Sequence, residues 1–143
     1  MLRDLVRNIS TGIDAINFSG MNVGLVDERG EIAALYKGIP QNDIGLRTDT
    51  LENIPKPIGI KMLIRSMAPE VIVADEIGTK QDVQAIKEAV CSGVKGIFTA
   101  HVKTKEELLK NPTLNELINE NIIEKIIFLK LDEKGRKLEE EVC

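Results

Sequence analysis

The sequence has little of what several large functional classes depend on. Aromatic residues make up 3% of the chain and tryptophan is absent, which is too little for a surface that stacks nucleic-acid bases. Lysine and arginine are scattered and the net charge is −4, so the chain has no basic field for nucleic acid. No apolar run approaches about 18 residues, and the first residues contain no signal-peptide core. We therefore expect no nucleic-acid partner and no transmembrane segment.

Cysteine and histidine are also scarce. Cys91 and Cys143 are far apart in the sequence, and His101 is the single histidine of the chain. Structural zinc sites need cysteine and histidine ligands at close, regular spacing, and this sequence has no such set. Two distant cysteines without a disulfide pattern are typical of a reduced, cytoplasmic protein, which is the location we predict.

What remains is the composition of an ordinary globular domain. The chain has 143 residues, of which 43% are hydrophobic and 29% are charged. A chain of this length buries about 68–70% of the surface that it exposes when unfolded, which is enough for a real core. We therefore predict a single domain over residues 1–143.

The order of the predicted elements favours an α/β fold. Predicted strands alternate with predicted helices from about residue 22 to residue 131, which indicates a mainly parallel sheet with flanking helices. A C-terminal β-hairpin is predicted to follow, with its turn at 132–135 and a polar second strand at 137–142. The predicted strands of the sheet are 22–28, 71–74, 95–101 and 122–131, and the longer predicted helices begin near Leu2, Ile58 and Thr79.

The sequence also predicts the local structure of three shorter segments. Residues 31–35 are predicted to return as a hairpin strand beside 22–28. Residues 37–57, which contain three prolines and two glycines, are predicted to be a long loop with a possible function. Thr104 and Thr113 are each followed by glutamate three residues later, which predicts two capped short helices separated by Pro112.

The most informative stretch of the chain is an apolar run that ends in two acids. Residues 71–74 fit a strand that is buried on both faces, and Asp75 and Glu76 follow at once. In open parallel sheets, ligands bind beyond the carboxyl ends of the strands. This is the Walker B arrangement, in which the first acid holds Mg²⁺ and the second polarises the attacking water. A strand that simply ends in solvent is the alternative. The chain contains no Gly-Lys-Ser/Thr, so the usual phosphate-binding loop is missing.

The next predicted strand ends in Thr99-Ala100-His101. Adjacent parallel strands bring their carboxyl ends together, so Thr99 or His101 is expected to face Glu76. A histidine at that place can donate a hydrogen bond to a phosphate or to the attacking water. An ordinary surface histidine is the alternative.

A second pair of acids, Asp27 and Glu28, ends the strand predicted at 22–28. Together with Asp75 and Glu76 they would place four carboxylates at one edge, and these repel one another unless a cation is present or exposure separates them. The alternative is a solvated hairpin turn. Arg65 precedes the Walker B strand by one helix. We expect it either to reach a phosphate, from this chain or from a neighbouring subunit, or to be a surface arginine.

These segments, taken in order, resemble the stage III sporulation protein AA family over nearly the whole chain. That family is similar to the ATPases of type II and type IV secretion systems, so the resemblance implies a partial RecA-like P-loop core. It further implies ATP hydrolysis with Mg²⁺ in a ring-shaped, hexameric motor, and a mother-cell role beside the channel that joins mother cell and forespore. The segments that carry the resemblance are 24–29, 45–49, 63–67, 73–78 and 99–101.

The resemblance also implies a set of site residues. Asp75 and Glu76 match the Walker B acids, for Mg²⁺ and for catalysis respectively. Asp27 and Glu28 fall in the acidic box of the secretion ATPases, and His101 falls in their histidine box. The implied catalytic set is Glu76, Glu28, His101 and Arg65, the implied cofactor contacts are Asp27 and Thr99, and the implied metal ligand is Asp75.

The sequence departs from the family pattern at its start. In the family, a Gly-Lys-Thr-Thr loop directly precedes the helix that begins here at Met1, so the chain resembles the C-terminal part of an ATPase domain. We expect such a chain to bind ATP and Mg²⁺ poorly by itself and to have an unpaired strand edge that promotes dimerisation or aggregation. Two other functions stay open: an assembly module that binds subunits and channel proteins without hydrolysis, and a metal-dependent phosphate-cleaving enzyme.

Overall fold

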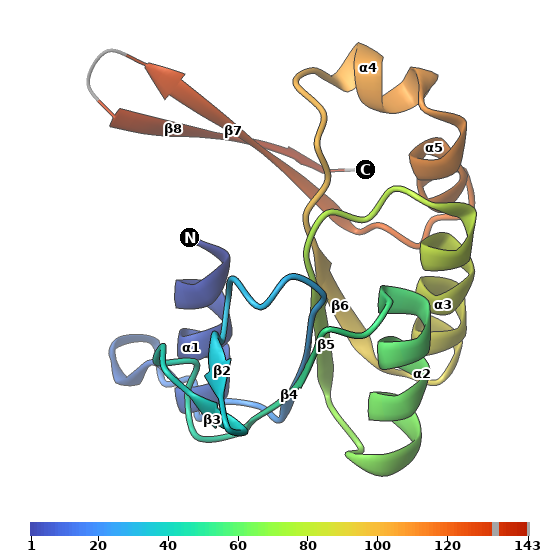
Figure 1. The fold of residues 1–143 in the computed structure, drawn as a ribbon. Helices are drawn as coiled ribbons and strands as arrows, with labels where there is room; N and C mark the ends of the chain where they lie inside the picture. Colours follow the sequence, from blue (N-terminus) through green and yellow to red (C-terminus); the bar gives the residue numbers. More distant parts are fainter. Residues whose placement is uncertain (133–134, 143) are drawn as a thin grey trace.

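A four-stranded parallel sheet forms the centre of the computed structural model, which describes residues 1–132 and 135–142 (Figure 1). The strands stand in the order β4-β1-β5-β6, and each neighbouring pair is parallel. The predicted α/β class and the predicted mainly parallel sheet are therefore confirmed. The strands are β1 (Val23–Asp27), β4 (Thr48–Glu52), β5 (Val71–Ala74) and β6 (Lys95–Phe98).

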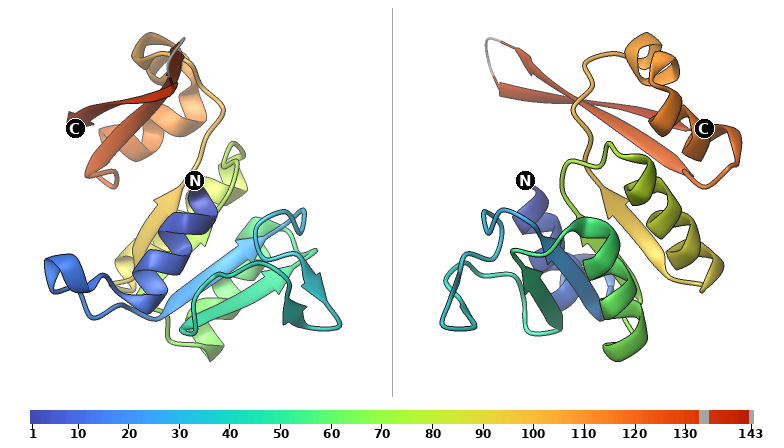
Figure 2. Two further views of the ribbon diagram at one scale, coloured as in Figure 1. Left: turned by 90° about the vertical axis from the view of Figure 1, so that its left-hand side faces the viewer. Right: turned by 45° about the vertical axis from the view of Figure 1, so that its right-hand side comes forward.

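Helices cover both faces of this sheet. Helix α1 (Leu2–Thr11) lies on one face, and α2 (Lys56–Ser66) and α3 (Lys80–Cys91) lie side by side on the other (Figures 1 and 2). The short 3₁₀ helix η1 (Asp14–Ile16) follows α1. Because the inner strands are covered on both sides, every residue of β1 and of β5 is buried, and Asp27 at the end of β1 is the one charged residue among them.

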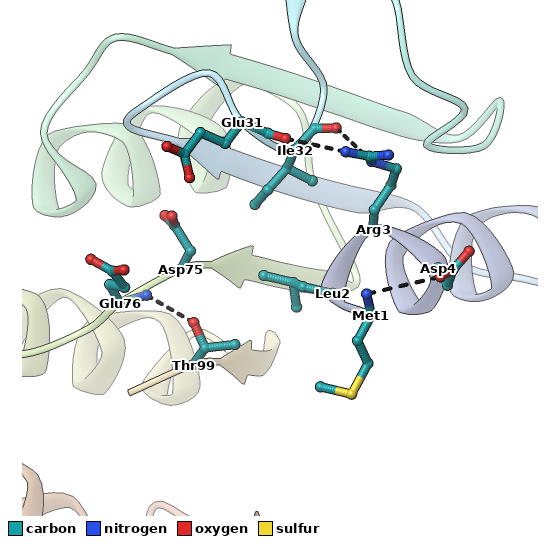
Figure 3. Close-up of a pocket in the computed structure, with 9 residues that line it drawn as sticks. All are labelled: Met1, Leu2, Arg3, Asp4, Glu31, Ile32, Asp75, Glu76 and Thr99. Atoms are coloured by element: carbon teal, nitrogen blue, oxygen red, sulfur yellow. Dashed lines mark hydrogen bonds and ion pairs between the residues drawn. The ribbon is translucent and has the colours of Figure 1, made fainter. Parts of the chain in front are cut away.

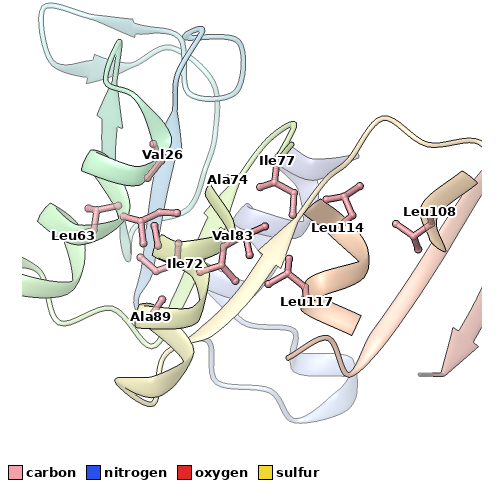
Figure 4. Close-up of a cluster of buried hydrophobic side chains, with 13 residues drawn as sticks. Val26, Leu63, Ile72, Ala74, Ile77, Val83, Ala89, Leu108, Leu114 and Leu117 are labelled. Atoms are coloured by element: carbon pink, nitrogen blue, oxygen red, sulfur yellow. The ribbon is translucent and has the colours of Figure 1, made fainter. Parts of the chain in front are cut away.

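The larger part of the core lies between the sheet and α2, α3 and α5 (Pro112–Asn119) (Figure 4). Ile72 of β5 and Leu63 of α2 are fully buried there, and Leu117 brings α5 into the same cluster. A second cluster joins α1 to the opposite face, through Val6 against Val23 and Val73. The two clusters hold the strand ends of the sheet in fixed relative positions.

The segment after β1 differs from the prediction. Residues 28–34 form turns and bends, so the predicted hairpin strand at 31–35 is wrong. The carboxylate of Asp27 accepts hydrogen bonds from the backbone N–H groups of Glu31, Ile32 and Ala33, which folds the segment back over the end of β1. Both edges of β1 are taken by the parallel strands β4 and β5. A short antiparallel pair, β2 (Leu35–Tyr36) with β3 (Ile39–Pro40), follows instead.

The stretch predicted as one long loop, 37–57, contains β3, the edge strand β4 and the first two residues of α2. Four of the five residues of β4 are polar and Leu51 is the one apolar residue, which is why the pattern did not show a strand. Thr48 and Asp49 pair with Val23 and Gly24 of β1. The tertiary pairing with a buried neighbour, rather than local propensity, makes this segment a strand.

The two short helices near the C-terminus are present, but one cap differs from the prediction. Thr104 caps α4 (Lys105–Lys110) as predicted, by accepting from the Glu107 N–H. Helix α5 is capped by Asn111 and not by Thr113: the Asn111 side chain accepts from the N–H groups of Thr113 and Leu114. Pro112 therefore begins α5, a position where a missing N–H has no cost, and does not merely separate two helices.

The C-terminal hairpin is confirmed. Strand β7 (Lys125–Asp132) pairs antiparallel with β8 (Gly135–Val142) in a separate two-stranded sheet (Figure 1). The prediction that the strand at 122–131 belongs to the parallel sheet is therefore wrong, because its partner is β8. The middle of the predicted turn, residues 133–134, and Cys143 lie outside the described residues. In the described part of the chain β5 is the only strand paired with β6, which leaves β6 at the sheet edge. None of the described helices has the length and apolar character needed to cross a membrane.

Candidate functional site

A pocket of about 410 Å³ lies at the edge of the sheet where the parallel strands end (Figure 3). The carboxylates of Asp75 and Glu76 lie on one side of it, and Met1 and Leu2 face them from the start of α1 (Figure 3). The pocket therefore brings together a strand end, a helix beginning and the turn after β1. Its lining is formed by residues 1–4 together with Glu31, Ile32, Asp75, Glu76 and Thr99.

Asp75 follows β5 directly and is the acid whose carboxylate keeps an oxygen available to a ligand. Its Oδ1 is buried and has no hydrogen-bond partner, although the residue lines the pocket. Burial raises the pKa of this carboxyl, against the opposing field of Lys56, and the nearby charges of Asp27 and Glu76 raise it further. A buried carboxylate oxygen without a partner is energetically unfavourable, and a cation or a donor in the pocket would relieve that cost.

Glu76 is held at two points in an uncommon backbone conformation. Its φ is 46°, in the left-handed region that non-glycine residues rarely adopt. Its N–H donates to Oγ1 of Thr99 at 2.9 Å, which confirms the prediction that the end of the next strand faces this acid. Its carboxylate is bound by Arg29, with Nη2 2.7 Å from Oε2 and Nη1 3.3 Å from Oε1. The side chain is thus anchored from β6 and from the turn after β1.

Asp27 serves the backbone of its own loop. It is fully buried, and its two carboxylate oxygens accept from three backbone N–H groups at 2.8–3.0 Å. It is not among the residues that line the pocket. The predicted direct contact between Asp27 and a cofactor is therefore not favoured by this geometry, because the oxygens are already committed to residues 31–33.

Two cationic side chains of this chain offset the repulsion expected among the four carboxylates. Lys56, at the start of α2 and largely buried, forms an ion pair with Glu28, and Arg29 pairs with Glu76. Cationic side chains are interleaved with the acids, so neither a metal nor solvent separation is required to hold the edge together. Among the described residues, no group of three acidic, histidine or cysteine side chains could hold a metal ion. Of these acids, Asp75 is the one that fits a cation, as a single ligand.

Four predicted site residues do not line the pocket: Asp27 and Glu28, which serve the turn after β1, and His101 and Arg65. His101 is exposed beyond the end of β6 and does not line it. Arg65 stands in the last turn of α2, which starts at the carboxyl end of β4 and runs back to the amino end of β5. Its charge acts on Glu88 of α3, at the end of the sheet opposite Asp75. This position does not favour a contact between Arg65 and a phosphate on this chain. A role toward a neighbouring subunit stays a prediction, and an exposed surface arginine stays the alternative.

The start of α1 is a pocket wall that the sequence did not reveal. Residues 1–4 line the pocket. The first N–H groups of any helix have no partner within the helix, and no side chain caps them in α1. Arg3 ties this end to the turn after β1 by donating to the carbonyls of Ile32 and Glu31. A helix beginning that faces a buried acid across a pocket combines an anion-binding end with a cation-binding oxygen.

Comparison with known proteins identifies the relatives of this chain. The family model described as sporulation stage III, protein AA matches residues 1–140. Stage III sporulation protein AA of Bacillus subtilis is 43% identical over 129 residues, which covers 90% of this chain and 41% of that protein. An uncharacterised protein, ycf45 of Porphyra purpurea, is 35% identical over 99 residues, covering 67% of this chain and 17% of its own length.

Solved structures show the same fold. The Legionella pneumophila ATPase DotB superposes with a TM-score of 0.62 at 17% identity, covering 97% of this chain and 39% of that chain. The pilus retraction motor PilT, solved with bound ADP, also gives 0.62 at 17% identity, covering 91% of this chain and 40% of its own. At this identity the likeness concerns the fold alone. The chain spans about two fifths of the Bacillus relative and of both solved chains.

Proposed function

Because the chain belongs to the stage III sporulation protein AA family, we propose that it carries the water-activating edge of an ATP-hydrolysing site. One observation carries this proposal: a buried Asp75 oxygen without a partner lies beside Glu76, across a pocket from the start of α1. A cation at Asp75 and an anion at the helix beginning would share one pocket. Mg²⁺ with a triphosphate has that charge pattern.

Each residue then has a distinct task. Asp75 holds Mg²⁺, directly or through water, and the ion when bound neutralises charge that develops on the phosphates. Glu76 accepts the proton of the attacking water. Thr99 fixes the backbone of Glu76, and Asp27 fixes the turn that carries Glu28 and Arg29.

The remaining assignments rest on the family resemblance and not on pocket geometry. Glu28 belongs to the acidic box but is paired with Lys56 here, so it would act only after that pair opens. His101 would have to approach from its exposed position, and Arg65 would serve a neighbouring subunit. Three further proposals rest on the same resemblance. The chain assembles into a ring, associates with channel proteins of the sporulating cell and lies in the mother-cell cytoplasm.

We place the phosphate-binding loop outside these 143 residues, because no Gly-Lys-Ser/Thr occurs among them. The backbone N–H groups and lysine of such a loop hold the phosphates, so the chain alone is proposed to be catalytically silent. Adding a polypeptide that carries the loop should restore turnover.

Calorimetry with ATP and Mg²⁺ on the isolated chain tests this arrangement. We expect no binding in the micromolar range by the chain alone, and ATP turnover when a segment with the loop is supplied. Micromolar binding by the isolated chain would refute the claim that the phosphate cradle lies elsewhere. Mg²⁺-dependent phosphate cleavage by the chain without any loop would instead support the metal-dependent enzyme considered as an alternative.

A second function has an observation of its own in its favour. The segment around β2 and β3 exposes large apolar side chains: Tyr36 is 63% exposed, Ile39 64% and Leu46 99%. Because three large apolar side chains are exposed within residues 36–46, an assembly module without hydrolysis is the second candidate. Mass measurement in solution separates the two. A stable oligomer whose size does not depend on nucleotide, and which stays inactive with the added loop, would favour the assembly module.

A further inference from the structure

Arg29 is presented to Glu76 by a turn that is fixed on several sides. Asp27 binds the backbone N–H groups of residues 31–33, and Glu52 of β4 accepts from the N–H of Leu35. The carbonyl of Ile32 accepts from the Arg3 and Asn42 side chains. These bonds come from α1, β1, β4 and the loop before β4. The arginine therefore stands on a rigid support rather than on a free surface loop.

The contact between Arg29 and Glu76 uses both ends of the carboxylate. Nη2 lies 2.7 Å from Oε2 and Nη1 3.3 Å from Oε1, which is the fork geometry of a paired arginine and carboxylate. The two residues come from the carboxyl ends of the neighbouring strands β1 and β5. Both oxygens of Glu76 are thus engaged by a cation.

We propose that Arg29 is a positioning residue that latches Glu76: it holds the carboxylate and must release it before Glu76 can serve water or metal. The inference rests on the function proposed for Glu76. Because each oxygen of the Glu76 carboxylate already accepts from a guanidinium N–H, the carboxylate is held toward Arg29 and must turn from it to bind water or metal. Release is therefore the step that makes the base available.

The backbone at Glu76 distinguishes this pair from an ordinary surface ion pair. A φ of 46° at a non-glycine residue has a conformational cost, and the bond from its N–H to Thr99 holds the residue in that state. Lys61 and Glu88 form a pair of similar exposure, 44% and 43% against 58% and 46%, but between two regular helices remote from the pocket. That pair is the matched control.

The first measurement asks whether the latch exists in solution. Nitrogen-15 spectra of the arginine side chains in the whole chain should show slow rotation of the Arg29 guanidinium, because a two-point pair hinders it. Glu76→Gln should restore fast rotation at Arg29, and Lys61→Gln should leave the Arg29 signals unchanged. Identical Arg29 signals in the wild type and in Glu76→Gln would overturn the latch.

The second measurement asks whether releasing the latch frees Glu76, with Mn²⁺ alone as the probe. Removing an exposed ion pair should allow Arg29→Gln to bind Mn²⁺ about two- to fivefold more tightly than the wild type. Arg29→Lys, which keeps the charge without the fork, should gain less. The gain should vanish in the double variant Arg29→Gln/Glu76→Gln, because it depends on the freed carboxylate.

The outcomes separate the latch from the function on which it rests. An equal gain with and without Glu76 would trace the effect to net charge and overturn the latch, as would no gain at all. Loss of Mn²⁺ binding in Asp75→Asn, with no gain in Arg29→Gln, would refute the latch alone. Mn²⁺ binding that is indifferent to Asp75→Asn would refute the proposed function itself.

Discussion

Asp27 is expected to be the residue on which the geometry of the site most depends. Its buried carboxylate satisfies three backbone N–H groups, two of them buried, and no other acceptor for them is found among residues 1–132 and 135–142. In Asp27→Ala these donors lose a charged acceptor. Each such loss costs about 1–3 kcal/mol, and part is recovered as the turn relaxes into water, so we expect a destabilisation of about 4 kcal/mol.

Asp27→Asn keeps the shape but exchanges one acceptor for a donor. Placed with its oxygen toward Ile32 and Ala33, the amide keeps two bonds and turns its NH₂ toward the Glu31 N–H. We expect about half of the cost in alanine, about 2 kcal/mol. Both variants should also speed hydrogen exchange at the amides of residues 31–33.

Urea unfolding measures these differences. With an m-value of about 2 kcal/mol/M, Asp27→Ala should lower the midpoint by about 2 M and Asp27→Asn by about 1 M. Asp49→Ala, an exposed acid on the neighbouring strand β4, is the control and should change stability by less than about 0.5 kcal/mol. A midpoint for Asp27→Ala within experimental error of the control would refute the argument that this carboxylate organises the turn.

Two other predictions concern packing and pH. A Cβ on Gly59 of α2 would meet Val26 Cγ1 of β1 at 2.7 Å, so Gly59→Ala should destabilise by about 1–3 kcal/mol in thermal melts. Gly78→Ala, where nothing lies within 4 Å, should be nearly neutral, and equal effects would contradict the packing. Because burial raises the pKa of Asp75, the folded state binds this proton more tightly than the unfolded state, and wild-type stability falls as pH rises through the raised value. The stability of Asp75→Asn relative to wild type should therefore grow from about pH 4 upward in metal-free unfolding experiments, and parallel pH profiles would disprove it.

Most of the fold could be predicted from the sequence through its apolar runs and its helix-capping residues. Residues 71–74 could be assigned because a strand covered on both faces has to be apolar throughout, and Thr79 because its side chain caps α3 locally. β4 could not be assigned, because its five residues become a strand only through pairing with β1. The same limit applies to residues 31–35, whose conformation is set by bonds from the Asp27 side chain.

The candidate site was predictable to the extent that it follows from strand ends. Parallel neighbours bring their carboxyl ends together, which placed Thr99 against Glu76. Orientation of long side chains was not predictable, so the pairing of Arg29 with Glu76 was missed. The signal available for it was an arginine between Glu28 and Gly30, on the tight turn that follows the acids.

The proposed role of Glu76 is to activate the attacking water, and the rate of single-turnover ATP hydrolysis measures that role without interference from product release. The measurement uses the chain joined to a segment that carries the phosphate-binding loop, and compares Glu76→Gln with Lys61→Gln. We expect Glu76→Gln to lower the hydrolysis rate by about 10²- to 10⁴-fold while ATP still binds. Lys61→Gln should change neither the hydrolysis rate nor the binding of ATP. Hydrolysis by Glu76→Gln at the rate of the control would contradict the proposed role.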